Sequence, residues 1–354
     1  MMRIKDYIAD GSISVLESMR LINANSRGII YICEGIKLKG VVTDGNIRRH
    51  ILKNGNLDDE IKNIMNREPK YIRNGDNIDF IEYMKVNSIT SVPIVNNKHE
   101  IIAIKFLNAK SAYQSENLDV PVVIMAGGKG TRLQPYTDVL PKPLIPIYDE
   151  TIIELIMSRF NEFGCNKFKI IVNYKKQLIK AFFSEVDKPY DIIFLEEQEF
   201  LGTAGGLKLL NDSCNSTFFL TNCDVLVETD YSDILKYHKE NKNIITMVCA
   251  AKKVSIPYGT VHVNENGHVE RLDEKPNFSF LANTGVYVIE PRFLEYIPDN
   301  TFIHITDVIE ACIKAGELIG MYPISEHAWF DMGQMDELER MKKHIERKEI
   351  TRFG

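Results

Sequence analysis

The pattern of apolar and polar positions changes about one third of the way along this chain of 354 residues. From residue 122 onward, short unbroken apolar runs alternate with longer segments whose apolar residues recur at helical spacing. Short unbroken runs are typical of strands buried on both faces of a parallel sheet, and their alternation with helices predicts an α/β domain. Strands are predicted at 122–125, 168–172, 191–195 and 218–224, and helices at 151–163, 175–185 and 334–348.

The first third of the chain contains a weak internal repeat instead. Residues 40–49 predict a strand that ends in a polar turn and starts a helix, and residues 100–110 have the same outline sixty positions later. Two β-α-β-β-α units of this size resemble a tandem pair of CBS domains. We therefore expect a first CBS repeat at 1–56, a second repeat with a polar linker at 57–118, and the α/β domain at 119–350.

The resemblance to CBS domains implies a nucleotide site in the first repeat. In that family, a G-h-h-T-x-x-D segment places a threonine at the phosphate and an aspartate at the ribose of an adenine nucleotide. Here Thr43 matches the threonine, while Asn46 stands at the aspartate position and lacks the charge-assisted strength of a carboxylate. The second repeat has Ile104 and Leu107 at these positions, so at most one site is expected. The alternative is a module that only pairs two copies of the chain into a homo-oligomer.

Composition excludes several classes of function. Hydrophobic residues make up 44% and charged residues 26% of the chain, which are ordinary globular values. A net charge of −6 argues against a partner that is a nucleic acid or a membrane surface. No apolar run approaches the roughly 18 residues of a membrane span, and the amino-terminal residues lack the apolar core of a signal peptide, which together predict a cytoplasmic protein. The 6 scattered cysteines indicate buried side chains and no metal or disulfide framework.

The segment that follows the first predicted α/β strand is the clearest candidate site. It reads Ala126-Gly127-Gly128-Lys129-Gly130-Thr131-Arg132-Leu133. Glycines permit tight turns and bring bare N–H groups close to a ligand, and cations at the carboxyl end of a strand favour phosphate. Ten residues after Arg132, Lys142 lies between two prolines, which restrict the loop and fix the position of the ammonium group.

Two common phosphate motifs are absent from this segment. It contains neither the G-x-x-x-x-G-K-[ST] of a P-loop nor the G-x-G-x-x-G of a Rossmann dinucleotide site. The combination of G-G-x-G-T-R-L with P-K-P-L resembles the signature of sugar-1-phosphate nucleotidyltransferases. The resemblance implies a Rossmann-like nucleotidyltransferase domain with a mostly parallel sheet, in which Ala126, Gly127, Gly128, Gly130 and Thr131 bind the nucleotide. It also implies that Arg132 and Lys142 are catalytic.

A second nucleotide-binding segment is expected at Leu201-Gly202-Thr203-Ala204-Gly205. In the family, this stretch lies beside the nucleobase, and members that transfer uridylyl or thymidylyl groups commonly carry glutamine five residues before its first glycine. This chain has Glu197 there. A carboxylate only accepts hydrogen bonds, which suits the adjacent N1–H and N2–H2 donors of guanine better than the mixed edge of uracil or thymine. We therefore predict GTP as the donor, the alternative being that Glu197 is a solvated surface acid.

The metal ligands are predicted from two distant segments. Asp224 ends the apolar run 218–224, at the edge of the sheet where ligands bind in α/β proteins. Trp329-Phe330-Asp331-Met332-Gly333 resembles the W-x-D-x-G segment that supplies a second carboxylate in the family. Mg²⁺ takes one or two carboxylates together with substrate phosphates, so the resemblance implies that Asp224 and Asp331 hold Mg²⁺.

Residues 258–290 resemble the half of the family's site that binds the sugar phosphate. A hairpin is predicted from strands 258–263 and 269–272 joined at Asn266-Gly267. The resemblance implies that Lys275 neutralises the sugar phosphate and Glu274 accepts protons from sugar hydroxyls. It also implies that Asn283 and Thr284 face the sugar and that Gly259 offers a backbone N–H.

These residues predict the reaction of a nucleoside triphosphate, GTP by preference, with a hexose or amino-hexose 1-phosphate. The products are a nucleotide sugar and pyrophosphate. A CBS pair in front of such a domain resembles bacterial enzymes that make precursors of surface glycans. Two alternatives stay open: transfer of a uridylyl, thymidylyl or cytidylyl group, and a regulatory relative that binds nucleotide without catalysis.

Overall fold

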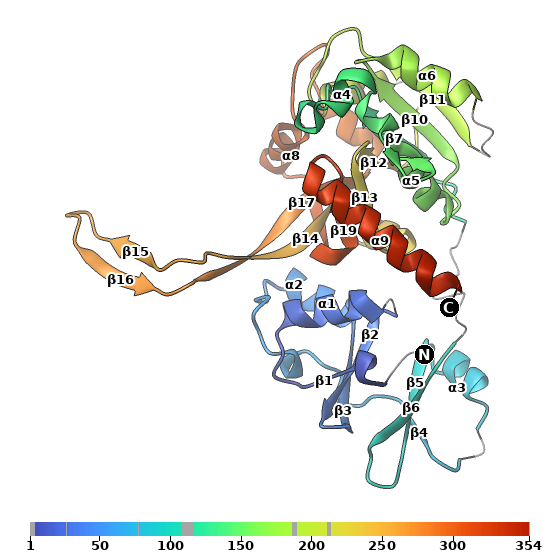
Figure 1. Cartoon of the computed structure of the whole chain (residues 1–354), viewed down its shortest axis with the longest axis vertical. Helices are drawn as coiled ribbons and strands as arrows, with labels where there is room; N and C mark the ends of the chain where they lie inside the picture. Colours follow the sequence, from blue (N-terminus) through green and yellow to red (C-terminus); the bar gives the residue numbers. More distant parts are fainter. Residues whose placement is uncertain are drawn as a thin grey trace. The chain divides into compact units, whose positions relative to one another are not determined.

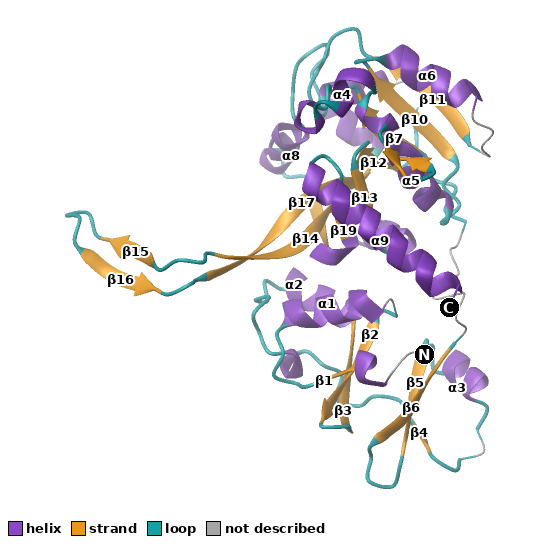
Figure 2. Cartoon of the chain, viewed as in Figure 1, coloured by secondary structure: helices purple, strands orange, loops and turns teal. Residues whose placement is uncertain are grey.

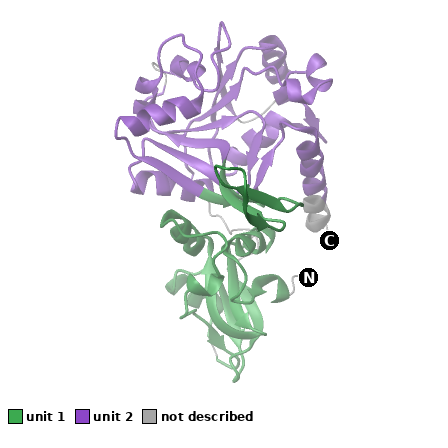
Figure 3. Cartoon of the chain, turned by 90° about the vertical axis from the view of Figure 1, so that its left-hand side faces the viewer, with its two compact units in different colours: residues 1–113, 250–282, 323–327 green, residues 114–249, 283–322, 328–354 purple. Residues whose placement is uncertain are grey.

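The structure is a computed structural model that describes residues 4–25, 27–76, 78–107, 117–185, 190–210 and 214–353. The chain divides into two compact units (Figure 3). Unit 1 comprises Met1–Tyr113, Ala250–Ala282 and Pro323–His327, and unit 2 comprises Gln114–Cys249, Asn283–Tyr322 and Ala328–Gly354. Most of the polar linker expected before residue 119 lies outside the described residues.

The centre of unit 2 is a seven-stranded sheet in the order β11-β10-β7-β12-β17-β14-β18 (Figure 1). β7, β10, β11 and β12 run parallel to one another, and β17 is antiparallel to β12. The predicted α/β fold with a mostly parallel sheet is confirmed. The strands are β7 (Val122–Ala126), β10 (Lys167–Val172), β11 (Asp191–Glu196), β12 (Phe218–Asn222), β14 (Ile245–Ser255), β17 (Asn277–Ile289) and β18 (Ile319–Ser325).

The helices beside this sheet follow the predicted periodicity. The segment predicted at 151–163 forms α5 (Ile152–Asn161), whose first turn is closed by a capping box between Thr151 and Glu154. The last predicted helix begins one residue later than expected and extends further. The helices are α4 (Tyr136–Val139), α5, α6 (Lys176–Glu185), α7 (Tyr231–Glu240), α8 (Ile305–Lys314) and α9 (Met335–Phe353), with 3-10 turns η3 (Thr131–Leu133), η4 (Lys142–Leu144), η5 (Gly205–Leu210) and η6 (Pro291–Tyr296).

Large apolar side chains fill the interior of unit 2. Phe160 stacks on Tyr231 with ring centroids 4.4 Å apart, and Phe219 meets the same tyrosine edge-on at 5.5 Å. A second group of buried side chains includes Phe218, Leu220, Tyr287, Ile289 and Phe293. Because β12 has apolar contacts on both faces, the backbone at its carboxyl end, which leads to Asp224, is held in a fixed position.

A two-stranded hairpin lies between β14 and β17. Its strands are β15 (Thr260–Val263) and β16 (Val269–Asp273), as the sequence predicts (Figure 2). Val261 pairs with Leu272 and Val263 pairs with Val269. The polar face carries His262 and Arg271, which both bind the carboxylate of Asp273, at 2.9 and 2.8 Å.

The amino-terminal part of unit 1 repeats one strand pattern. In each half a parallel pair is followed by an antiparallel pair, giving sheets β1-β2-β3 and β4-β5-β6. The repeat inferred from the sequence is thus present in the topology. Its elements are η1 (Ile4–Tyr7), β1 (Ile8–Ala9), α1 (Val15–Asn25), β2 (Ile29–Glu34), β3 (Lys37–Thr43), α2 (Asp44–Leu52), η2 (Ile61–Asn63), β4 (Ile72–Arg73), α3 (Phe80–Val86), β5 (Ser91–Val95) and β6 (Ile101–Phe106).

The two repeats share one interior. The buried hydroxyl of Tyr31 lies 2.7 Å from Ser91 Oγ in the other repeat. One apolar cluster contains Ile29 and Leu38 from the first repeat and Val95 and Ile101 from the second. The halves therefore stabilise each other. Among the residues that the structure describes, no helix combines the length and apolar character needed to cross a bilayer.

Candidate active site

The predicted phosphate loop leaves the carboxyl end of β7, between β10 and β12. Gly130 has φ +68°, a left-handed conformation that glycine adopts without strain. A β-carbon on Gly130 would lie 2.9 Å from Thr137 Cγ2 and 3.0 Å from Lys142 Cβ, so the loop packs directly on the lysine. Lys129 and Arg132 are exposed, and cations at this position are free to meet a phosphate.

Lys142, Asp224 and Asp331 form a cluster in which Lys142 and Asp224 are buried and Asp331 is partly buried. The ammonium of Lys142 makes an ion pair with Asp224 Oδ2, and 11% and 10% of the two side chains are exposed. A β-carbon on Gly333 would lie 2.6 Å from Asp224 Oδ2, 2.8 Å from Asp331 Oδ1 and 2.9 Å from Lys142 Nζ. A side chain at this position would displace these three charged groups, and the glycine allows them to converge.

Strand pairing explains how residues so far apart in sequence meet. β13 (Val225–Val227) pairs antiparallel with β19 (Trp329–Asp331), which places Val225 opposite Asp331. The Met332 N–H donates to the Asp224 carbonyl at 2.8 Å, and the Gly333 N–H donates to Asp331 Oδ1 at 3.0 Å. The two predicted metal ligands are therefore brought together.

The donor set fits Mg²⁺ of the kind that is shared with a substrate. Within the described ranges, no group of three or more His, Cys, Asp or Glu side chains is arranged to hold a metal. Two carboxylates are what Mg²⁺ needs when phosphates and water complete its shell. Asp224 and Asp331 would hold the ion, and Lys142 already provides a positive charge at the same place.

Glu197 lies at the other end of the glycine loop. Its N–H donates to the Val172 carbonyl at 3.0 Å, and only 2% of the residue is exposed. A β-carbon on Gly127 would lie 2.5 Å from Glu197 Oε2, and one on Gly206 would lie 2.3 Å from Oε1. The carboxyl group is thus sandwiched between two glycines, and the interpretation of Glu197 as a solvated surface acid is wrong.

Neither oxygen of the Glu197 carboxyl group makes a hydrogen bond of good geometry, although the Leu201 N–H lies close enough to act weakly on it. Burial raises its pKa to about 7, against a smaller lowering by the Leu201 N–H. Its neighbour Glu196 behaves oppositely, because hydrogen bonds from Lys176 and Lys180 lower the pKa of that carboxyl to about 2. A buried carboxyl without partners is rare in proteins and indicates a group that a ligand completes.

The segment after Glu197 is fixed by backbone contacts. Gly202 has φ +81°, and a β-carbon there would lie 2.5 Å from the Ile303 carbonyl. The Thr203 hydroxyl accepts a hydrogen bond from the Ile305 N–H at 3.0 Å, at the start of α8. Thr203 therefore anchors the loop to a helix through its side chain, which leaves its backbone for a nucleotide.

The residues predicted to bind the sugar phosphate fall in both units. Gly259, Glu274 and Lys275 belong to the hairpin segment of unit 1, where Glu274 Oε2 approaches Gly259 and Lys275 has φ +46°. Asn283 and Thr284 belong to unit 2. They lie inside β17, which begins at Asn277.

Side chains at these two β17 positions are already bonded. Asn283 Nδ2 donates to Tyr287 Oη at 2.8 Å, and the buried Thr284 hydroxyl donates to the Val248 carbonyl at 2.7 Å. Thr284 thus joins β17 to β14. Asn283 keeps one amide hydrogen for another acceptor.

Thr43 and Asn46 form the amino-terminal cap of α2. The Asn46 N–H donates to Thr43 Oγ1 at 3.4 Å, and Asn46 Oδ1 accepts from the Thr43 N–H at 3.1 Å and hydroxyl at 2.7 Å. This reciprocal arrangement is a capping box. It gives both residues a role in folding, and nucleotide binding there stays a prediction.

Sequence reasoning assigned no role to two residues that shape the site. Gly333 is the glycine of the W-x-D-x-G segment, and its lack of a side chain leaves room for three charged groups. Asn173, at the end of β10, donates to the Glu197 carbonyl at 3.3 Å and lies 3.3 Å from the β-carbon position of Gly127. Its place directly after a predicted parallel strand was the available signal.

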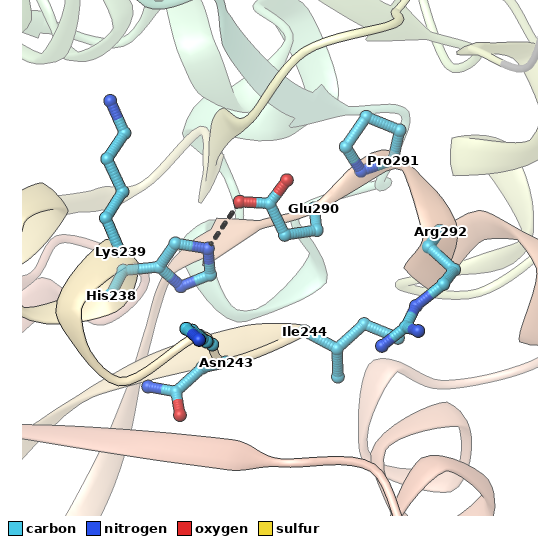
Figure 4. Close-up of a pocket in the computed structure, with 8 residues that line it drawn as sticks. His238, Lys239, Asn243, Ile244, Glu290, Pro291 and Arg292 are labelled. Atoms are coloured by element: carbon cyan, nitrogen blue, oxygen red, sulfur yellow. Dashed lines mark hydrogen bonds and ion pairs between the residues drawn. The ribbon is translucent and has the colours of Figure 1, made fainter.

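A separate cavity of about 400 Å³ lies at the ends of the central strands opposite the glycine loop. Figure 4 shows the residues that line it. It adjoins the start of β12, where Phe218 pairs with Ile289. Buried His238 lies 2.8 Å from Thr246 Oγ1 and 3.0 Å from Glu290 Oε1, and its burial lowers its pKa. Because both ring nitrogens have partners, this histidine serves the fold.

The profile of the nucleotidyl transferase family matches residues 121–348. The chain therefore belongs to this family of nucleotidyl transferases. It is 26% identical over 249 residues to the UTP–glucose-1-phosphate uridylyltransferase of Synechocystis sp., covering 64% of each chain. It is 32% identical over 223 residues to the mannose-1-phosphate guanyltransferase of Schizosaccharomyces pombe, covering 60% of each.

Solved structures support the same fold. The crystal structure of HddC from Yersinia pseudotuberculosis complexed with GMP-PN matches with a TM-score of 0.51 and 20% identity, over 64% of this chain and 99% of that chain. The chain spans about three fifths of the length of the curated relatives that it matches.

Proposed function

We propose that the protein transfers a nucleotidyl group from a nucleoside triphosphate to a sugar 1-phosphate. The convergence of Lys142, Asp224 and Asp331 around Gly333 carries this proposal. Two acids that can share a cation with phosphates, next to an ammonium and a glycine loop, suit stabilisation of a transferring phosphoryl group. The names of the relatives, which include a guanyltransferase and a uridylyltransferase of sugar 1-phosphates, agree with this chemistry.

The chemical step needs no general base, because the sugar phosphate oxygen is already anionic at neutral pH. That oxygen attacks the α-phosphorus in line, forming the new P–O bond as the bond from the α-phosphorus to the bridging oxygen breaks. The electron pair of the broken bond leaves with pyrophosphate. Catalysis then consists of positioning and charge neutralisation.

Each charged group has one role in this step. Asp224 and Asp331 would hold Mg²⁺, which would supply positive charge to the phosphates. Lys142 stabilises the negative charge on the α-phosphate, and Arg132, in the 3-10 turn of the glycine loop, clamps the triphosphate. Lys275 and Glu274 bind the phosphate and hydroxyl groups of the sugar.

The donor is proposed to be GTP. Glu197 supports this choice because its two oxygens are buried and lack partners. A guanine base presents two adjacent N–H donors that would satisfy both oxygens, whereas uracil offers one donor beside an acceptor. Ala126, Gly127, Gly128, Gly130, Thr131, Gly202 and Thr203 would bind the rest of the nucleotide through their backbone.

The wider role is proposed as the supply of nucleotide sugars for surface glycans. The amino-terminal repeats would act as a CBS pair that binds an adenine nucleotide at Thr43 and Asn46, or that joins two copies of the chain. The repeated strand pattern and the shared interior of the repeats support a single module.

Pyrophosphate release by the purified protein with Mg²⁺ tests the activity. Five nucleoside triphosphates would be assayed against the 1-phosphates of mannose, glucose, glucosamine and N-acetylglucosamine. Release with GTP and one sugar phosphate is the expected result, and an Asp224→Asn variant should abolish most of it. An Asp336→Asn variant makes the same chemical change at an exposed position of α9 and should retain full activity. No release with any pair, from folded protein, would overturn the proposal.

A further inference from the structure

The buried Glu197 carboxyl group is the feature of unit 2 that the proposed reaction leaves least explained. Asp224 is neutralised by Lys142, and Glu196 by two lysines of α6. Glu197 alone of these three has no ion pair, and both its oxygens lack a hydrogen bond. An isolated carboxylate is costly to bury, so this group is expected to keep its proton to a higher pH than an ordinary glutamate does.

The surroundings of Glu197 are apolar or neutral on each packed element. The carboxyl group lies between Gly127 of the loop after β7 and Gly206 of η5. Asn173, directly after β10, bonds the Glu197 carbonyl, and a methyl group of Ile171 in β10 lies beside Gly206. The charged groups of the adjoining elements are used elsewhere: Lys208 of η5 bonds the Leu294 carbonyl, and Lys176 and Lys180 of α6 bind Glu196. Burial is the main cause of the raised Glu197 pKa, and no charged side chain contributes to it.

The two ionisation states of this group present different hydrogen-bonding patterns. The carboxylate offers two acceptors, which match N1–H and N2–H2 of guanine. The neutral acid offers one O–H donor and one carbonyl acceptor, the same pair that a glutamine side chain offers. That pair matches the carbonyl and N3–H of uracil or thymine. Guanine can also meet it by using O6 and N1–H.

We infer that the ionisation state of Glu197 sets nucleobase choice, so that uridine and thymidine nucleotides are accepted only when the group is protonated. This inference rests on the proposed function, in which Glu197 faces the base. Guanine is accepted in both states, while the mixed edge of uracil repels the second oxygen of the carboxylate. The same side chain therefore gives strict guanine selection above neutral pH and relaxed selection below it.

The size of the effect follows from the titration. A group with a pKa near 7 is about nine-tenths protonated at pH 6 and about one-tenth protonated at pH 8. The kcat/KM for UTP should therefore fall about tenfold from pH 6 to pH 8 relative to that for GTP. Taking the ratio of the two substrates removes the titration of the sugar phosphate and of the triphosphate, which affects both alike.

Two arms make the test independent of turnover. The first measures kcat/KM for GTP and UTP with one sugar phosphate at pH 6, 7 and 8. The second measures the dissociation constants of GMP and UMP by calorimetry at the same pH values, which needs no catalysis. Glu197→Gln is the matched control, because its amide fixes the mixed pattern and should make the UTP to GTP ratio high and independent of pH.

The outcomes separate this inference from the proposed function. A ratio that falls about tenfold in the wild type and stays flat in Glu197→Gln supports the inference. Turnover with a ratio that does not change with pH overturns it and leaves the proposed function standing. Absence of turnover defeats the proposed function, and the UMP and GMP affinities then decide the inference. Failure of both nucleotides to bind at every pH overturns it as well.

Discussion

Asp224 and Glu197 are both buried carboxyl groups of unit 2, at two ends of one glycine loop, yet their surroundings differ. Gly130 packs against Lys142, which makes an ion pair with Asp224, whereas Gly127 packs against Glu197 itself. Asp224 is 7% exposed and charge-compensated, and Glu197 is 2% exposed and has no partner. The first group is balanced within the protein, and the second is left for a ligand or a proton to balance.

This difference agrees with what each end of the loop is proposed to bind. Phosphates and a metal ion bring several charges, so a set of opposite charges held in place lowers the cost of reorganisation. A nucleobase brings neutral N–H donors, and a charged partner from the protein would compete for the carboxyl oxygens. Substitutions at Asp224, Lys142 and Glu197 should therefore fail in different ways.

The largest expected effect is on turnover at the compensated end. Asp224→Asn removes the charge that would hold Mg²⁺ and should lower kcat by about 10²–10³, the scale for one preorganised charge-stabilising group. Steady-state kinetics with saturating GTP and sugar 1-phosphate measures this. Arg132→Ala should lower kcat on the same scale, because its guanidinium is proposed to bind the pyrophosphate. Near-normal turnover of either variant would remove that residue from the mechanism.

The second effect is on stability at the same end. Lys142→Met leaves Asp224 and Asp331 without their resident cation, and the free energy of unfolding should fall by about 3 kcal/mol in EDTA. The chain has 1 tryptophan, Trp329 in β19, so its fluorescence during urea unfolding follows this part of unit 2. Added Mg²⁺ should restore part of the loss by binding only the folded state.

Lys142→Arg is the control for charge. It should retain most of the stability in EDTA, because the cation stays beside the two acids. If Lys142→Met unfolds at the wild-type urea concentration, the ion pair with Asp224 contributes nothing to stability and the comparison with Glu197 loses its basis.

The third effect is at the uncompensated end and has the opposite sign. The Glu197 pKa rises from 4.5 in the unfolded chain to about 7 in the folded protein, so the folded state binds the extra proton between these values. Stability contributed by this proton is complete below about pH 4.5 and is lost as the pH rises through 7. Glu197→Gln should therefore be more stable than the wild type by about 3 kcal/mol at pH 8.

Trp329 fluorescence in urea at pH 6 and pH 8 measures this gain. The difference between Glu197→Gln and the wild type should shrink to about 2 kcal/mol at pH 6, because the folded wild type then keeps its proton while the unfolded chain is still mostly ionised. A variant that is less stable than the wild type at pH 8 would mean that the carboxylate is stabilised by contacts other than those described.

The elements that depend only on residues close together in the chain were predicted from the sequence. β7, the glycine loop and α5 follow from an apolar run, from three glycines and from helical spacing with a capping threonine. The proximity of Asp224 to Asp331 was predicted only from the resemblance to the nucleotidyltransferase family, since nothing near either residue indicates that β13 pairs with β19. The ion pair of Lys142 with Asp224 was not predicted, because the two residues are 82 positions apart and meet only through the tertiary fold.

The burial of Glu197 was the least accessible from sequence. Glu196 and Glu199 on either side give the stretch the composition of a surface loop, and Glu196 is indeed bound by surface lysines. The glycines that enclose Glu197 come from positions 127 and 206. Gly127 was assigned to the nucleotide and Gly206 was given no role, whereas the small size of both leaves room for a glutamate side chain.

The smallest expected effect concerns the cap of α2 in unit 1. Thr43→Ala removes the oxygen that accepts from the Asn46 N–H and should destabilise α2 by about 1 kcal/mol. Hydrogen exchange of the α2 amides should then be about five times faster, while Thr43→Ser, which keeps the hydroxyl, should exchange at the wild-type rate.

Repeating the measurement with AMP separates the two roles of Thr43. If the residue also binds a nucleotide, AMP slows exchange in the wild type and in Thr43→Ser but not in Thr43→Ala. If AMP has no effect on the wild type, Thr43 and Asn46 serve only as a helix cap, and the amino-terminal repeats bind no adenine nucleotide there.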